Sequence, residues 1–149
     1  KAGGITTLEE KSLGCIHKGG HTPVMEVYDY AKQVEAKKGL VIMDTPGNDP
    51  SSVAGMVAGG AQIVVFSTGR GTPTGNPIAP VIKITGNKLT YAKMSDNIDV
   101  DASPIIYGEL KKLGDNFLKL TAEVASGRQT KAESLGFTEM AIARVCNFV

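Results

Sequence analysis

The sequence lacks several features that would point to a class of protein at once. It has no tryptophan, only two cysteines, and aromatic side chains at 5% of its 149 positions. No segment approaches the roughly 18 consecutive apolar residues that a membrane-spanning helix needs. The N-terminus also has no apolar core of a secretory signal. We therefore expect a soluble protein of the cytoplasm.

An excess of charge of one sign is also missing. Sixteen basic and fifteen acidic residues leave a net charge of +1, and basic residues run no longer than the pairs Lys37-Lys38 and Lys111-Lys112. Nucleic acids and anionic membranes are therefore not expected partners. Cys15 and Cys146 have no metal-binding or redox spacing, so we expect reduced thiols without a chemical role.

What the sequence does contain is typical of a globular protein. Hydrophobic residues make up 42% and charged residues 21%, so we expect residues 1–149 to form a single α/β domain with its own core. The first residue is lysine rather than methionine, which favours a trimmed product or a piece of a longer chain. Glycines cluster at 55–60 and 69–75, and this clustering is the first indication of a functional site.

Two helices are predicted near the N-terminus. A capping box of Thr6 or Thr7 with Glu9 or Glu10 begins the first, and Gly14 is expected to end it. Pro23 begins the second, which is expected to continue until Lys37–Gly39 because apolar residues recur at helical spacing. These apolar residues are Val24, Val27, Ala31 and Val34.

Short apolar runs predict strands in the middle of the chain. The runs 40–43 and 63–66 flank a predicted helix that starts at Asp49-Pro50 and ends before Gly59-Gly60. This order is typical of a βαβ unit, and continuous apolar runs are typical of parallel strands buried on both faces. Further strands are expected at 80–84 and 98–100. The pattern predicts a three-layer α/β fold with a mostly parallel, Rossmann-like sheet and flanking helices.

A long helix is predicted to begin at Ser103-Pro104 and to end at Gly127. It carries a stripe of apolar residues at alternating spacings of four and three, which we expect to pack across the sheet. The stripe consists of Ile106, Leu110, Leu113, Phe117, Leu120 and Val124. The last apolar segment, 140–145, is expected to form a short helix or an edge strand.

The glycine-rich loop that follows Phe66 is the main candidate for a binding site. Ligands of parallel sheets bind beyond the carboxyl ends of the strands, and glycines allow backbone N–H groups to converge on an anion. An arginine between two glycines can bind a carboxylate or phosphate with two hydrogen bonds. Tight turns with a solvated arginine are the structural alternative. The candidate substrate-binding residues are Thr68, Gly69, Arg70, Gly71, Thr72, Thr74 and Gly75.

The loop does not match a known nucleotide motif. No Gly-Lys-Ser or Gly-Lys-Thr ends it, and the third glycine of a dinucleotide fingerprint is missing. Asp44 and Asn48 follow the strand 40–43, so we expect them near the same crevice, Asp44 as a catalytic and Asn48 as a substrate-binding residue. Asp49 is assigned to helix capping. Lys83 is either the polar end of a half-exposed strand or a catalytic lysine directed into the site.

Two groups of residues resemble metal ligands only loosely. Asn97, Asp99 and Asp101 imitate the start of a calcium loop, but Ala102 stands where that loop needs glycine. His17 and His21 are four residues apart, but two glycines between them argue against a shared helix. We assign no metal ligand to this chain.

Several ordered segments resemble the C-terminal part of the altronate and galactarate dehydratase family. They are Thr6–Ile16, Pro46–Asp49, Phe66–Gly75, Pro80–Ile84 and Ala125–Gly127. The resemblance implies the C-terminal domain of a longer enzyme that removes water from a sugar acid with Fe²⁺ or another divalent metal. Within this family, which also includes lyases that split sulfolactate, Thr6–Ile16 and Pro46–Asp49 look nearer to altronate dehydratases.

The implied chemistry needs a base and positive charge to stabilise an enediolate. We expect Arg70 and the glycine amides to hold the carboxylate, and Lys83 to add charge or to act as the base. The metal ligands are expected in the remaining domains, so the chain alone should be inactive. Two other interpretations stay open, namely a non-catalytic module that binds a carboxylate or phosphate and a structural domain for oligomer contacts. The oligomeric state, including a homo-oligomer, is left open.

Overall fold

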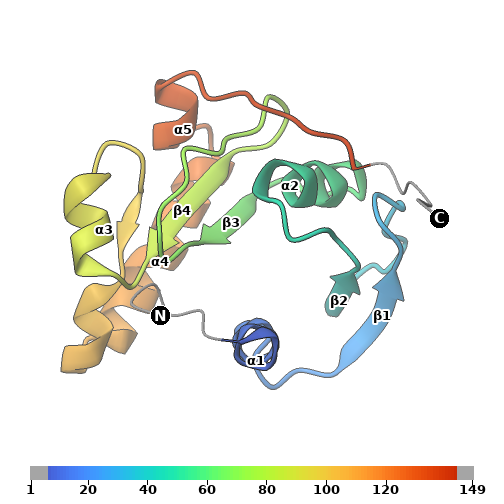
Figure 1. Ribbon diagram of the computed structural model, residues 1–149, viewed down its shortest axis with the longest axis horizontal. Coiled ribbons are helices and arrows are strands. Elements are labelled where there is room, and N and C mark those ends of the chain that lie inside the picture. The colour runs from blue at the N-terminus through green and yellow to red at the C-terminus, as the bar shows by residue number, and fades with distance from the viewer. Residues whose placement is uncertain (1–6, 144–149) are drawn as a thin grey trace.

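The structure is a computed structural model that describes residues 7–143, in which helices flank short parallel strands in a three-layer, Rossmann-like arrangement (Figure 1). This confirms the expected α/β fold class. None of the helices described has both the length and the hydrophobicity to cross a bilayer. In chain order the elements are α1 (Leu8–Lys18), β1 (Val24–Tyr28), β2 (Leu40–Met43), α2 (Asp49–Ala58), β3 (Val64–Ser67), β4 (Val81–Thr85), α3 (Lys88–Lys93), β5 (Val100–Asp101), the 3-10 helix η1 (Ser103–Tyr107), α4 (Leu110–Ala125) and α5 (Lys131–Ser134).

The described strands form two separate parallel sheets. One pairs β1 with β2, and the other has the order β3-β4-β5. The apolar runs 40–43, 63–66 and 80–84 were correctly predicted as strands to within one residue. The expectation that β2, α2 and β3 form one βαβ unit was wrong, because β2 and β3 belong to different sheets.

The predicted second helix is also wrong, because its first residues form strand β1. Val24 and Val27 have helical spacing, but β-branched and aromatic side chains favour strands. Pairing with β2 decides the outcome, with Val27 opposite Ile42 and Tyr28 opposite Met43. After Tyr28 the chain turns, and the Tyr28 hydroxyl accepts hydrogen bonds from the N–H groups of Glu35 and Ala36 at 3.2 and 3.1 Å.

The helix boundaries differ from the predictions at two glycines. Thr7 caps α1 as expected, accepting a hydrogen bond from the Glu10 N–H at 3.2 Å, while Thr6 lies outside the described residues. The helix continues through Gly14 to Lys18. The long helix begins at Leu110 rather than Ser103, because Gly108 has a φ of 89° and separates it from η1. A left-handed residue cannot continue an α-helix.

Only part of the predicted apolar stripe is buried. Val124 is 5% exposed, and Leu113, Phe117 and Leu120 are half-buried, whereas Ile106 and Leu110 are exposed. The part of the segment 140–145 that the structure describes, residues 140–143, forms neither helix nor strand, and the rest lies outside the described residues.

The core that positions the candidate site lies between α2 and the strands β3 and β4. Val53, Val64 and Val81 are buried there, and burying each such side chain contributes about 1.5–3 kcal/mol. Pro50 occupies the first turn of α2, as expected, but the N-cap is Asn48 rather than Asp49, which is the first residue of the helix. The core fixes β3 and β4, and therefore the positions of the segments that follow their carboxyl ends.

Candidate functional site

The glycine-rich loop lies within the connection from β3 to β4, residues 68–80, which we call the crossover loop. Because β3 and β4 are parallel, the chain must return from the carboxyl end of β3 to the amino end of β4. It does so without a helix, and the loop contacts β4 directly through Lys83. Thr72, Thr74 and Asn76 are buried. The loop is therefore an ordered layer of the fold.

Lys83 is completely buried in the middle of β4, with a relative exposure of 0%. Its Nζ donates hydrogen bonds to the carbonyl oxygens of Pro73 at 3.0 Å and Thr74 at 3.2 Å. The Nζ also lies 5.9 Å from the centroid of the Phe137 ring. Burial lowers the pKa of Lys83 below its ordinary value, and attraction to Asp99 and Glu139 opposes this effect. The prediction of a half-exposed strand end was wrong, and the predicted catalytic role stays a prediction.

The tip of the crossover loop, residues 68–71, is held by the hydroxyl of Thr68 within the tip and by two residues that follow β4, Asn87 and Thr90. The Gly69 carbonyl accepts hydrogen bonds from Thr90 Oγ1 at 2.8 Å and, less closely, from Asn87 Nδ2 at 3.4 Å. The Gly71 N–H donates to Thr68 Oγ1 at 3.0 Å. Gly71 has a φ of 88°, a conformation that favours glycine.

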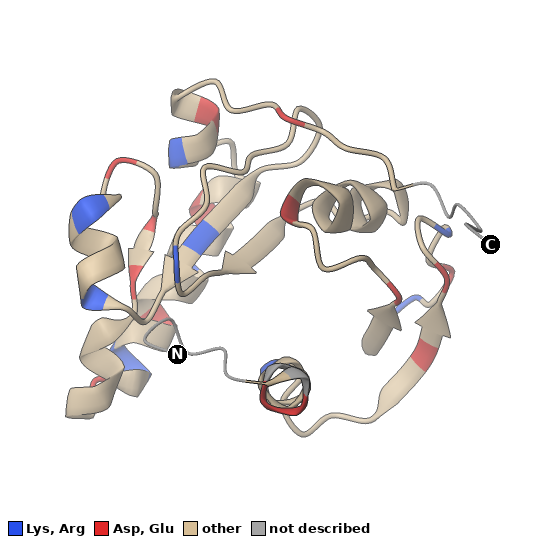
Figure 2. Cartoon of the chain, viewed as in Figure 1, with Lys and Arg blue, Asp and Glu red and all other residues tan. Residues whose placement is uncertain are grey.

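Arg70 lies at this tip and is exposed. In the part of the chain that the structure describes, the exposed N–H groups of Gly69, Arg70 and Gly86 donate no hydrogen bond. The N–H of Arg70 points away from Asn87 and Thr90, because it opposes the Gly69 carbonyl across a trans peptide. Figure 2 shows that α3, next to the tip, carries basic and no acidic residues. The tip therefore offers hydrogen-bond donors and positive charge to an anion.

The remaining predicted loop residues face the interior. Thr72 Oγ1 and Thr74 Oγ1 are 2.8 Å apart and hydrogen-bonded, and both residues are buried. Gly75 is also buried, and a Cβ at this position would lie 2.0 Å from the carbonyl oxygen of Phe137. A substrate-binding role for these three residues stays a prediction, while the structure gives each of them a packing role.

Asp44 and Asn48 make their hydrogen bonds with residues outside the loop tip. The N–H of Asp44 donates to the Tyr28 carbonyl at 2.9 Å, and its side chain is exposed. Asn48 Oδ1 accepts hydrogen bonds from the Ser51 N–H at 3.3 Å and Oγ at 3.0 Å, which caps α2. Among the described residues, no hydrogen bond or ion pair joins the segment 44–49 to the crossover loop, and β2 and β3 point in different directions (Figure 1).

Sequence reasoning missed the segment that follows β4. Asn87 and Thr90 hold the loop tip, and the free N–H of Gly86 lies next to Asn87 in the chain. The signal was present, because Gly86-Asn87 directly follows an apolar strand, as the other two candidate segments do. Only the pairing of β4 beside β3 shows that this strand end and the loop tip meet.

The described part of the chain does not offer a ligand set for a divalent metal. It contains no cluster of three His, Cys, Asp or Glu side chains. Asp99 uses its two carboxylate oxygens for the N–H groups of Lys83 and Lys131, at 2.8 and 2.9 Å. Asp101 accepts a hydrogen bond from the Ser103 N–H at 2.9 Å. Both carboxylates therefore accept hydrogen bonds from backbone N–H groups of this chain.

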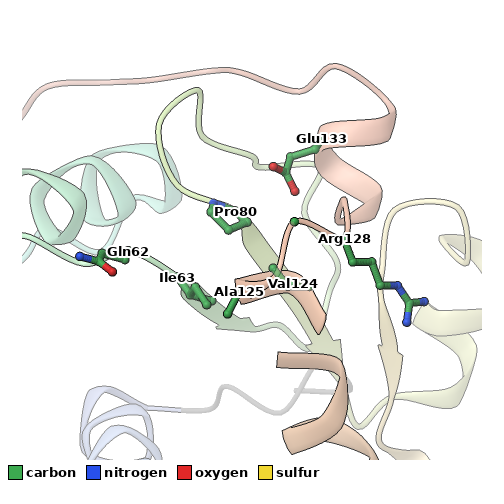
Figure 3. Close-up of a pocket in the computed structure, with 8 residues that line it drawn as sticks. Gln62, Ile63, Pro80, Val124, Ala125, Arg128 and Glu133 are labelled. Carbon is green, nitrogen blue, oxygen red and sulfur yellow. The ribbon is translucent and has the colours of Figure 1, made fainter. Parts of the chain in front are cut away.

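Two cavities lie away from the loop tip. One of about 330 Å³ is lined by Ile63 and Pro80 at the amino ends of β3 and β4 and by Val124 of α4 (Figure 3). Its charged neighbours are already paired, Arg128 with Glu123 and Glu133 with the N-cap of α5. The other, of about 410 Å³, is mainly apolar and lies between β2 and α2. Neither is lined by a predicted site residue.

The family model described as the C-terminal part of D-galactarate/altronate dehydratase matches residues 1–147. The altronate dehydratase of Escherichia coli (strain K12) is 42% identical over 143 residues, which cover 95% of this chain and 28% of that protein. The altronate dehydratase of Bacillus subtilis (strain 168) is 40% identical, with coverage of 95% and 29%.

A relative with another activity is equally similar. The (2R)-sulfolactate sulfo-lyase subunit beta of Chromohalobacter salexigens is 40% identical over 146 residues, which cover 96% of this chain and 37% of that protein. The chain thus spans between 28% and 37% of the length of these three relatives.

Proposed function

The chain belongs to the family of D-galactarate/altronate dehydratase C-terminal domains, and from this membership we propose that it forms part of a hydro-lyase that dehydrates a sugar acid. Two altronate dehydratases that share 40% or more of the aligned residues support this proposal. The resemblance predicted from the sequence segments is confirmed at the level of the family. The acting enzyme would be a longer, cytoplasmic protein of which this chain is the C-terminal domain.

The proposed reaction removes a proton from the carbon next to the carboxylate. The hydroxyl on the neighbouring carbon then leaves as water, and the resulting enol becomes a 2-keto-3-deoxy acid. Charge builds up on the carboxylate oxygens as the proton leaves, so fixed donors at these oxygens lower the barrier. The protein must therefore hold the carboxylate firmly.

The exposed Arg70 at the pinned loop tip is the observation that carries the proposal for this chain. Its guanidinium would bind the substrate carboxylate through two hydrogen bonds. The free N–H groups of Gly69 and Arg70 would add donors, and Gly86 would add one from the end of β4. A flexible loop would lose entropy on binding, whereas this tip is already ordered by Thr68 and Thr90.

The proton base and any metal ligands are proposed to lie elsewhere in the longer enzyme. The described residues offer no metal cluster, and no contact brings Asp44 or Asn48 to Arg70. Fe²⁺ or another divalent metal would then be bound by the remaining domains. We expect the chain alone to be inactive for this reason.

A sulfo-lyase is the second candidate, favoured by the sulfolactate sulfo-lyase subunit among the relatives. Sulfolactate and the sugar acids share a carboxylate with a hydroxyl on the adjacent carbon. A clamp for that common end would serve both reactions, and the leaving group would be selected elsewhere.

The test is turnover of altronate, galactarate and sulfolactate with ferrous iron. The longer protein that carries this chain is compared with residues 1–149 alone, each with and without Arg70→Ala. We expect activity only in the longer protein and its loss with Arg70→Ala. Unchanged activity of the Arg70→Ala variant would contradict the proposed clamp. Turnover of none of the three acids would favour a non-catalytic binding module.

A further inference from the structure

Hydrogen bonds from other segments fix the crossover loop at two places, with Arg70 close to the first. The first anchor is the tip, where the Gly69 carbonyl binds Thr90. The second anchor is the buried arm, residues 72–76, where Lys83 Nζ binds the carbonyls of Pro73 and Thr74 at 3.0 and 3.2 Å. Without the second anchor, packing at Gly75 would be left to hold the buried arm near β4.

Lys83 is a costly choice for a purely structural position. Removing an ammonium group from water costs several kcal/mol, and carbonyl oxygens replace only part of its hydration. Neither ion pair in the described range involves Lys83. A methionine would fill the same space without this cost, but it would leave the two carbonyls without their donor.

The position of Nζ also argues against direct contact with a substrate. The side chain has no exposed surface, and the crossover loop and Phe137 lie against its end. A lysine base needs a free lone pair directed at the substrate proton. Here two N–H groups are directed at carbonyl oxygens instead.

From this geometry we propose that Lys83 is a positioning residue, which holds the buried arm on β4 so that Arg70 is presented to the substrate carboxylate. The inference rests on the proposed function for its catalytic consequence. The anchoring itself is independent of any substrate. Lys83 therefore acts through Arg70 and touches neither the substrate nor a reacting atom.

The experiment compares Lys83→Met and Lys83→Gln in the protein that carries this chain, with Lys119→Met as a control at an exposed lysine of α4. Methionine removes every donor, whereas glutamine keeps a neutral donor that is one bond shorter. Hydrogen exchange of residues 71–76 reports on the anchor, and exchange in α2 reports on global folding. Steady-state kinetics with the acid that the enzyme turns over report on the carboxylate clamp.

We expect Lys83→Met to speed exchange at 71–76 by about tenfold or more while α2 and the control stay unchanged. KM should rise and kcat/KM should fall by about 10- to 100-fold, because small displacements of a binding group have effects of this size. Lys83→Gln should recover part of both losses, because glutamine still donates a hydrogen bond. Glutamine could not replace a lysine that acts as the proton base.

Three results would overturn the proposal. The first is unchanged exchange at 71–76 in Lys83→Met. The second is an equal rise in exchange at 71–76 and in α2, which would show a general loss of stability. The third is an equal loss of kcat in both variants with the loop still protected, which would assign Lys83 to the chemical step. If the wild type turns over no tested acid, the exchange data still decide the anchor, and only the proposed function fails.

Discussion

The polar segments that follow β2 and β3 look alike in the sequence and differ in the structure. Both follow a short apolar strand and are rich in turn-forming residues. The segment 44–48 is largely exposed, and its clearest contacts cap α2. The crossover loop 68–80 is pinned to α3, to Lys83 and, by close packing, to Phe137.

The difference follows from what each segment connects. The segment after β2 enters a helix directly, so capping hydrogen bonds satisfy most of its requirements. The segment after β3 must reach the neighbouring parallel strand without a helix, so it has to lie on the sheet and bury polar groups. A loop under this constraint holds its tip in one place, which suits a binding site.

The largest effect is expected from removing the guanidinium at the loop tip. Arg70→Ala should lower kcat/KM of the longer enzyme by about 100-fold, because hydrogen bonds to charged groups contribute about 1.5–3 kcal/mol each. Asp44→Asn is the matched change in the other segment and should stay within about twofold. Steady-state kinetics with the preferred acid check both. A larger loss for Asp44→Asn would reverse the comparison and place catalysis after β2.

Gly75→Ala tests the packing of the buried arm. A Cβ would meet the backbone oxygen of Phe137 at 2.0 Å, so the free energy of unfolding should fall by about 1–3 kcal/mol. Gly114→Ala has no atom within 4 Å of the new Cβ and lies in α4, so it should be stabilising by up to about 1 kcal/mol. Denaturant unfolding of both variants gives the comparison. Equal stability of the two would show that Phe137 moves aside freely.

Asn48→Ala tests whether the segment 44–48, which follows β2, has only a structural role. Loss of the N-cap of α2 should lower the free energy of unfolding by about 1 kcal/mol and leave KM unchanged. Thermal unfolding and kinetics on the same preparation provide the two readouts. A rise in KM without a loss of stability would instead support the substrate-binding role predicted for Asn48.

The smallest effect is a dependence of stability on pH at the second anchor. Burial lowers the pKa of Lys83 in the folded state, so the unfolded state binds more protons between that value and the ordinary value of 10.5. The free energy of unfolding should therefore rise with pH through this range. Lys83→Met should remove this contribution. The free energies of unfolding of the wild type and the variant, measured against pH, should therefore differ in slope over this range. The same pH dependence of the free energy of unfolding in both proteins would contradict the lowered pKa of Lys83.

Local patterns predicted what depends on neighbouring residues. Apolar runs located β2, β3 and β4, Thr7 located the start of α1, and Asp49-Pro50 located the start of α2. Ordered segments such as 66–75 predicted the family, which the comparisons confirm. Arg70 between two glycines predicted donors for an anion from the residue types alone, and binding of an anion there stays a prediction.

The tertiary structure decided what depends on distant residues. Val24–Tyr28 became a strand because it pairs with 40–43, and Lys83 became an anchor because the loop returns over β4. A Cβ at Gly75 would clash with the carbonyl oxygen of Phe137, a residue far along the chain. Thr90, which follows β4, holds the Gly69 carbonyl.

 The physical reason is the range of the interactions. Helix caps and apolar runs act between residues a few positions apart, so the sequence alone determines them. Strand pairing and the burial of a charged side chain join residues far apart in the chain, and only the folded arrangement settles which partners meet. The sequence by itself therefore determined the family and most strands, and it predicted hydrogen-bond donors for an anion at the tip. The packing of the crossover loop on β4 decided where that tip is held.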